Sequence, residues 1–295
     1  MSAVPSAVPL PMPNAAAPVQ PLAPSSATSA ARRVSPVRWA RGGLQWVSLF
    51  ACIALWHLAT TRHLNLGLIT FANVPTPAEV LAAGWALLQS PKLVAHLTSS
   101  LLRIAFGFGA AALVGVALGL LIGRLRWARL VLLPPLEVLR PIPAVAWIPL
   151  AILMFPSSEG SMVFITFTGA VFPILLNTIH GVEAIDARLV ASARSLGTSR
   201  GRLFTEVIAP GAAPSIVTGL SIGMGTCWFC LVTAEMIAGQ YGIGYFTWES
   251  YTVQNYPNIV VGMLLIGALG MGSSALIQWA GGRLMPWYRL QRGVR

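Results

Sequence analysis

Charged residues are scarce in this 295-residue chain, where Asp, Glu, Lys and Arg together make up only 9% of the sequence. Soluble domains carry about 25% charged residues, and the mean hydropathy here is +0.73. The scarcity of charge therefore excludes an ordinary soluble domain and predicts an integral membrane protein.

The residue patterns of metal sites, redox sites and nucleotide sites are missing as well. The four histidines have no metal-ligand spacing, so no metal site is predicted. Cys52, Cys227 and Cys230 lie in apolar runs, which argues against a disulfide framework and favours packing over a redox role for the Cys227–Cys230 spacing. No Gly-x-x-x-x-Gly-Lys-Ser/Thr loop occurs, and no Ser, His and Asp cluster indicates catalysis. The chain is thus expected to be neither an enzyme nor itself a nucleotide-binding protein.

Six apolar stretches are long enough to cross a bilayer, which needs about 20 residues per helix. They lie at about 44–61, 101–122, 130–155, 161–179, 215–238 and 258–279. The expected fold is therefore all-α and polytopic, with about six transmembrane helices.

The basic residues predict the orientation of these spans. With the N-terminus in the cytoplasm, 15 of the 19 basic residues fall on the cytoplasmic side, namely Arg32, Arg33, Arg38, Arg41, Arg124, Arg126, Arg129, Arg188, Arg194, Arg200, Arg202, Arg283, Arg289, Arg292 and Arg295. Arg62, Lys92 and Arg103 are assigned outside, and Arg140 within a span. This asymmetry follows the positive-inside rule, so both termini are predicted to be cytoplasmic. Because the arginines are spread over several loops, the net charge of +11 does not indicate nucleic-acid binding.

The two ends of the chain differ from its centre. Residues 1–31 contain no charged side chain and are rich in Pro, Ala and Ser, which excludes a signal peptide and indicates disorder. The predicted organisation is a cytoplasmic tail with a basic flank over 1–43, a transmembrane domain over 44–287, and a basic cytoplasmic C-terminus over 288–295.

A few polar residues interrupt the spans. Glu137 and Arg140 are spaced to share a helix face and form an ion pair, and Pro141, Pro143 and Pro149 are expected to break that helix. Glu235 is expected to face the interior of the bundle near its outer end. Two interpretations stay open for these residues: a border of the translocation path, or a structural and gating role. Small residues, Ala111, Gly115, Gly119 and Gly123 in the second span and Gly219 with Gly223 in the fifth, predict close helix packing.

The outer loops carry two further patterns. Residues 75–88 start with Pro75-Thr76-Pro77 and continue with apolar residues at helical spacing, which predicts an amphipathic helix at the interface. Residues 239–257 form a second outer loop that is rich in Tyr, Phe and Trp. Such aromatic residues are typical of an interfacial belt.

The most informative segment is the polar stretch over 182–213, between two spans. Two short helical patterns flank a turn at Gly197-Thr198-Ser199, and Pro210 and Pro214 are expected to end the second pattern. The predicted element is a cytoplasmic helix-turn-helix.

This segment resembles the EAA loop of ATP-binding cassette (ABC) importer permeases, through which a separate ATPase subunit drives the membrane subunit. The positions on the family pattern are Ala193, Arg194, Leu196, Gly197, Val207, Ile208 and Pro210, and Arg200 lies in the same loop. Ala191 replaces the usual glutamate, Ser192 the next alanine, and Ala209 the leucine before the proline. The run from Glu137 to Pro149 and the Gly242-Ile243-Gly244-Tyr245 segment resemble the nitrate, sulfonate, taurine and bicarbonate branch of these permeases.

The resemblance implies the membrane subunit of a binding-protein-dependent importer for a small anion, in the bacterial inner membrane. Its implied partners are an ATPase that binds ATP and Mg²⁺, an external substrate-binding protein, a second permease copy, and membrane lipids. This chain would hold no cofactor. The alternative is a secondary transporter or channel without an ATPase, which would depend on acidic residues such as Glu137 and Glu235 for ion coupling.

Overall fold

The computed structural model describes residues 36–65, 67 and 70–287, and the side chains from residue 44 onward. The predicted tail over 1–35 and the basic C-terminus over 288–295 lie outside these residues. The chain divides into two units between Ala51 and Cys52, so the division falls within the first helix. The first unit contributes the beginning of that helix, and the description below concerns the second unit.

The part of the chain that the structure describes is helical and contains no β-strand, which confirms the all-α prediction. The elements are α1 (Pro36–Thr61), α2 (Pro77–Leu88), α3 (Pro91–Arg124), α4 (Arg126–Leu139), the 3-10 turn η1 (Ala144–Trp147), α5 (Ile148–Met154), α6 (Ser158–Glu183), α7 (Ala187–Ser195), α8 (Arg200–Arg202), the π-helical segment η2 (Leu203–Ile208), α9 (Ala209–Ala238), α10 (Ile243–Thr252) and α11 (Tyr256–Leu284). Helix α1 already begins at Pro36, within the predicted basic flank.

Five of the described helices are long and apolar enough to cross a membrane, and α4 with η1–α5 makes a sixth only as a pair bent by 82°. The third span expected over 130–155, with a break at its prolines, corresponds to this bent pair. The break follows Leu139, where Pro141 and Pro143 each lack an amide donor and so end the helical hydrogen bonding. The proline break itself was predicted correctly.

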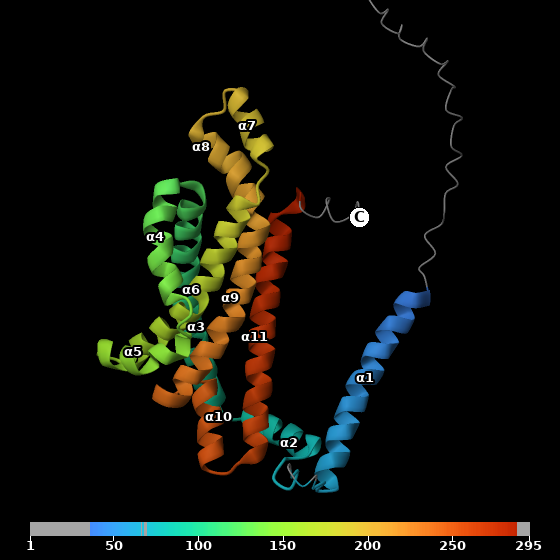
Figure 1. Ribbon diagram of the computed structural model, residues 1–295. Coiled ribbons are helices and arrows are strands. Elements are labelled where there is room, and N and C mark those ends of the chain that lie inside the picture. Colours follow the sequence, from blue (N-terminus) through green and yellow to red (C-terminus); the bar gives the residue numbers. More distant parts are fainter. Residues whose placement is uncertain (1–35, 66, 68–69, 288–295) are drawn as a thin grey trace, which may run out of the picture. The chain divides into compact units, whose positions relative to one another are not determined.

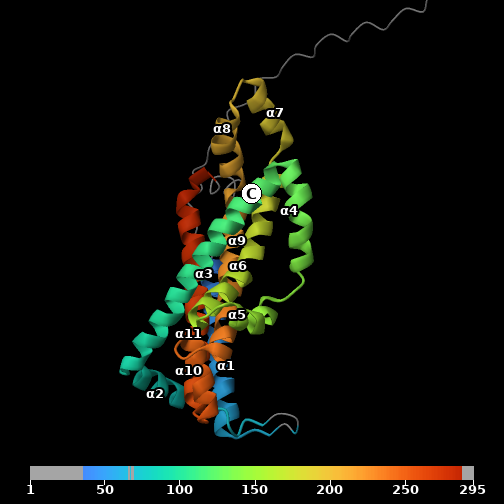
Figure 2. The same ribbon diagram turned by 90° about the vertical axis from the view of Figure 1, so that its left-hand side faces the viewer.

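Helix α6 is the central helix of the second unit. It packs against α3 on one side and α9 on the other, and α11 packs against α9 (Figures 1 and 2). The core between these helices contains Ile165, Ala170 and Ile174 of α6 together with Ala111 of α3 and Leu231 of α9.

The small residues of α3 make the close approach to α6 possible. A Cβ atom added at Gly119 would lie 2.5 Å from the Cβ of Thr178, and one added at Gly115 would lie 3.0 Å from a methyl carbon of Ile174. On α9, a Cβ added at Gly223 would lie 2.9 Å from the Ile174 side chain. The small residues therefore serve packing within the bundle, as predicted.

Two expectations about the outer segments have different outcomes. Helix α2 is confirmed, and it begins with a capping box in which Thr76 and Glu79 bind each other's backbone amides. The segment over 239–257 is not simply a loop, because α10 occupies Ile243–Thr252 within it. Its buried residues Ile243, Thr247 and Ser250 recur at helical spacing, a pattern that the surrounding aromatic residues obscured in the sequence.

Candidate functional site

Two groups of functional side chains lie at opposite ends of the second unit. Helices α7 and α8 are at one end, and α2 and α10 are at the other (Figure 1). The α7–α8 end is the one that the arginine distribution predicts to face the cytoplasm.

The turn between α7 and α8 is a Schellman motif centred on Gly197. The Gly197 amide donates to the Arg194 carbonyl at 3.0 Å, and the Thr198 amide donates to the Ala193 carbonyl at 3.2 Å. Gly197 has φ of +78°, which a residue with a side chain adopts only with strain. The glycine is thus required for the direction in which the chain leaves α7.

The second half of the predicted helix-turn-helix does not end at Pro210. Residues Arg200–Ala238 form one continuous helical rod of 39 residues, about 58 Å long at 1.5 Å per residue. The rod passes through the π-helical segment η2 directly before Ala209 and Pro210. The wider turn of a π-helix accommodates the missing amide and the bulk of the proline ring, so the expected stop at Pro210 is wrong.

The rod is anchored to the end of α3 by Arg124. The Arg124 Nη2 atom donates to the Arg200 carbonyl at 3.2 Å, and the guanidinium carbon lies 5.3 Å from the centre of the Phe204 ring. Leu203 and Ile208 are buried beside it. Arg124 thus connects the start of the rod to the end of α3.

The outer surface of this helix-turn-helix is apolar at two exposed positions. Leu196 is 86% exposed and Leu189 is 58% exposed, and arginines surround them in the sequence. The structure thus brings the predicted loop residues Ala193, Arg194, Leu196, Gly197 and Arg200 together around one turn, while Pro210 lies further along the rod. Exposed apolar residues outside a membrane span are typical of a protein contact.

At the opposite end, Arg103 is the centre of a buried polar cluster. Its Nε and Nη2 atoms donate to the two oxygens of Glu159 at 2.8 and 2.5 Å. Its Nη1 atom donates to Glu235 Oε1 at 2.8 Å and to the Tyr241 carbonyl at 2.7 Å. Arg103 lies on α3, in its first half, and is only 2% exposed.

Glu235 is fully buried and faces the bundle interior, as predicted. Besides Arg103, its carboxylate accepts a hydrogen bond from Ser100 Oγ at 2.7 Å and one from the Gly244 amide at 2.9 Å. Donors thus surround both oxygens, an arrangement that stabilises an ionised carboxylate. Within the described residues, the Glu235 carboxylate therefore already accepts three hydrogen bonds from the protein.

The same cluster holds the segment that leads into α10. The Gly242 amide donates to His96 Nδ1 at 3.1 Å, and the Ile243 amide donates to Ser100 Oγ at 2.9 Å. Gly242 has φ of +129°, and a Cβ atom there would lie 2.3 Å from the Glu235 carboxyl carbon. The glycine is required both for its φ and for space.

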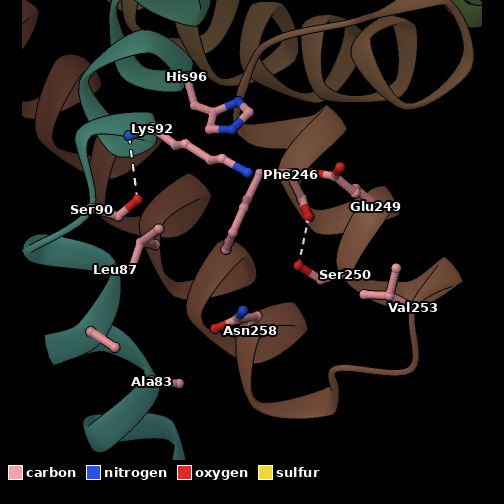
Figure 3. Close-up of a pocket in the computed structure, with 11 residues that line it drawn as sticks. Ala83, Leu87, Ser90, Lys92, His96, Phe246, Glu249, Ser250, Val253 and Asn258 are labelled. Carbon is pink, nitrogen blue, oxygen red and sulfur yellow. Dashed lines mark hydrogen bonds between the residues drawn. The ribbon is translucent and has the colours of Figure 1, made fainter.

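A pocket of about 340 Å³ lies beside this cluster, between α2, α3, α10 and α11 (Figure 3). Lys92 and His96 of α3 and Glu249, Ser250 and Asn258 of the outer segments line it (Figure 3). Because one ammonium group and one carboxylate line the pocket, it has no net preference for an anion or a cation.

The predicted ion pair between Glu137 and Arg140 is absent from the described residues. Both side chains are exposed, and Arg140 is the C-cap of α4, directly before the proline break. With Pro141 and Pro143, these residues form the bend after α4 and make no hydrogen bond to the Glu235 cluster.

Sequence reasoning missed Arg103, His96, Ser100 and Glu159 as a cluster. A signal was available, because residues 96, 100 and 103 follow the i, i+4, i+7 spacing of one helix face. No sequence signal joined that face to Glu159 and Glu235, which lie 56 and 132 residues from Arg103.

Comparison with known proteins gives one matching family and several similar proteins. Residues 115–290 match the family described as binding-protein-dependent transport system inner membrane component. The nitrate import permease protein NrtB of Synechocystis sp. is 36% identical over 209 residues, 68% of this chain and 76% of that protein. The putative aliphatic sulfonates transport permease protein SsuC of Escherichia coli is 35% identical over 264 residues, 88% of this chain and 99% of that protein.

A third relative and one solved structure are also similar. The bicarbonate transport system permease protein CmpB of Synechococcus elongatus is 36% identical over 182 residues, 61% of this chain and 66% of that protein. The solved structure, titled "Crystal structure of an amino acid ABC transporter with histidines", has 17% identity and a TM-score of 0.49, and covers 65% of this chain and 92% of that one. The match of the family over more than half of the sequence, with one relative similar over 88% of this chain, shows that this chain is a multi-pass membrane protein of the binding-protein-dependent transport system inner membrane component family.

Proposed function

We propose that this chain is the membrane-spanning permease subunit of an ATP-driven importer for a small anion. The observation that carries the proposal is the exposed helix-turn-helix of α7 and α8, with Leu196 86% exposed at its turn. Because the loop is continuous with α9 and anchored to α3 through Arg124, a protein that binds it can move two spans together.

The proposed source of the movement is a separate ATPase subunit. The sequence contains no phosphate-binding loop, so ATP and Mg²⁺ would be bound by that subunit and this chain would need no cofactor. Ala193, Arg194, Leu196, Gly197, Arg200 and Pro210 are the residues proposed to couple the two proteins.

The remaining partners follow from the same proposal. An external binding protein would deliver the substrate, and two copies of this chain would enclose the path in the bacterial inner membrane, with both termini in the cytoplasm. The names of the relatives, for nitrate, aliphatic sulfonates and bicarbonate, support a small anion as the substrate class. Glu137, Arg140, Pro141 and Pro143 are proposed to border the path at the bend after α4, and Glu235 to hold its outer end.

The alternative is a secondary transporter that needs no ATPase. Ion coupling would require an acidic residue that binds and releases a proton or a cation. Glu235 is a poor candidate, because three groups already donate hydrogen bonds to it. Glu137 is the other acidic residue that the sequence places within a span, and it is exposed near the bend after α4.

Reconstituted uptake distinguishes the two. Full-length permease is placed in vesicles with a candidate ATPase subunit and a candidate binding protein, and uptake of nitrate, bicarbonate, taurine and an alkanesulfonate is measured. The proposal predicts uptake of at least one of these anions that requires ATP on the ATPase side and the binding protein on the other. Equal uptake without the ATPase, driven by an ion gradient, would support the secondary transporter.

A further inference from the structure

A cavity of about 750 Å³ lies between the helix-turn-helix of α7 and α8, called the coupling loop below, and the ends of the long helices α3 and α6. Its lining comes from the end of α3, the end of α6, helix α7, the turn at Gly197 and Thr198, and the start of the long rod. The cavity therefore joins the loop to the body of the bundle.

The charged lining of the cavity is entirely positive. Arg124, Arg194 and Arg200 line it, and no Asp or Glu does. A guanidinium group stays charged at any physiological pH, so three like charges surround one space. Such an arrangement is stabilised when an anion occupies that space.

The carboxylates near the cavity already have other partners. Glu183, which follows the lining residue Val182 in sequence, forms an ion pair with Arg129 of α4. Asp186 caps α7 by accepting a hydrogen bond from the Arg188 amide at 2.8 Å. Within the described residues, no ion pair involves Arg124, Arg194 or Arg200.

Arg124 also has an unused donor. Its Nη2 atom binds the Arg200 carbonyl, and its guanidinium group lies over Phe204, but its Nη1 atom is buried without a hydrogen-bond acceptor. A buried donor without an acceptor is destabilising. A rotation of the Arg124 side chain, which lines the cavity, would bring this donor to an oxyanion there.

We propose that this cavity is an oxyanion site that binds a phosphate group. Arginines suit phosphate because their N–H groups match its oxygens in pairs, and Thr198 adds a hydroxyl group to the lining. The phosphate group belongs either to the headgroup of an acidic lipid or to free phosphate. In both cases the bound group links Arg124 of α3 to Arg194 and Arg200 of the loop, and so stiffens the connection through which the loop moves the spans.

The test uses the purified full-length chain without any ATPase, so its outcome is independent of the proposed function. Inorganic phosphate is titrated into protein in uncharged detergent at constant ionic strength, with chloride as the reference, and thermal unfolding is followed by Trp fluorescence. The wild-type chain should show a saturable rise in Tm with phosphate and none with chloride.

The variant R194Q/R200Q should bind phosphate at least about tenfold more weakly, since charge-assisted hydrogen bonds to two arginines are lost. The matched control is R188Q/R202Q, which removes two charges from the same loop at exposed positions that do not line the cavity. The control should keep the wild-type response. If the double variant does not fold, R194Q alone is used, because the Arg194 side chain makes no hydrogen bond within the described residues.

Native mass spectrometry separates the two sources of phosphate. Retention of phosphatidylglycerol by the wild-type chain and the control, but not by R194Q/R200Q, identifies a lipid headgroup, and phosphate should then compete with that lipid. A phosphate response without lipid retention identifies the free ion. The proposal is overturned if both double variants respond equally to phosphate. It is also overturned if neither phosphate nor phosphatidylglycerol binds to the wild-type chain. That second result would favour an acidic segment of a partner protein as the occupant.

Discussion

Arg103 shows at the residue scale how one buried cation organises the outer end of the bundle. It lies on α3 and bonds to Glu159 at the start of α6, to Glu235 near the end of α9, and to the Tyr241 carbonyl before α10. The two carboxylates differ in environment, since the Glu159 side chain is 66% exposed and that of Glu235 is fully buried. Loss of the interaction with Glu235 is therefore the one that leaves a buried charge without a neutralising cation.

Replacing Arg103 by Met should be strongly destabilising. The change leaves the buried Glu235 carboxylate without its cation, which costs about 3–5 kcal/mol when one partner of a buried pair is removed. The double change R103M/E235Q should recover part of that loss, because it removes both charges. Thermal unfolding of the four proteins of this cycle in detergent measures the coupling, and simple additivity would count against the pair.

A matched control is the pair of Arg129 and Glu183, whose side chains are 52% and 34% exposed. Replacing Arg129 by Met should cost at most about 1 kcal/mol, because solvent screens an exposed pair. Equal losses for R129M and R103M would show that burial does not determine the importance of the pair.

At the scale of the element, the close packing of helix α3 against α6 depends on glycines of α3. Gly119 and Gly109 lie on the same helix, but a Cβ at Gly119 meets Thr178 at 2.5 Å, whereas a Cβ at Gly109 meets nothing within 4 Å. The sequence shows the row of small residues that contains Gly119. The structure shows which glycines of α3 face a neighbouring helix.

Alanine at these two positions should have effects of opposite sign. G119A should lower the free energy of unfolding by about 1–3 kcal/mol through overpacking, while G109A should be neutral or stabilise by up to about 1 kcal/mol through higher helix propensity. Chemical unfolding in mixed micelles tests both. Equal destabilisation by the two changes would refute the packing role assigned to Gly119.

The elements also show which features could be predicted from the sequence. The apolar stretches and arginines predict the number of spans, and Gly197 predicts the turn of the helix-turn-helix, because both signals are local. The bend of 82° after α4 was indicated only as a break, since prolines determine where a helix ends and tertiary packing determines the angle. The Arg103 cluster joins residues more than 100 positions apart, and no periodicity in one sequence reports such contacts.

At the scale of the whole molecule, the two ends of the second unit are expected to lie on opposite sides of the membrane. The coupling loop lies at one end and the pocket with Lys92 lies at the other (Figures 1 and 3). The arginines of the loop predict, by the positive-inside rule, that the first end faces the cytoplasm. This orientation is required for an ATPase to reach the loop.

Cysteine labelling in intact cells tests the orientation. In a C52A background, which leaves the buried Cys227 and Cys230 in place, T198C should react with a membrane-impermeant maleimide only after the cytoplasmic side is opened. K92C and N255C should react from outside. Labelling of T198C from outside would place the loop beyond the reach of ATP.

The most direct test of the central claim is uptake by Gly197 variants in vesicles that contain the ATPase and the binding protein. Gly197 has φ of +78° and open space around its missing Cβ, so a substitution acts through backbone strain rather than through a clash. Asn tolerates this φ and Val does not. The account predicts that G197V inserts normally but loses ATP-dependent uptake and co-purification of the ATPase, whereas G197N keeps most of both. Undiminished uptake by G197V without bound ATPase would contradict the account.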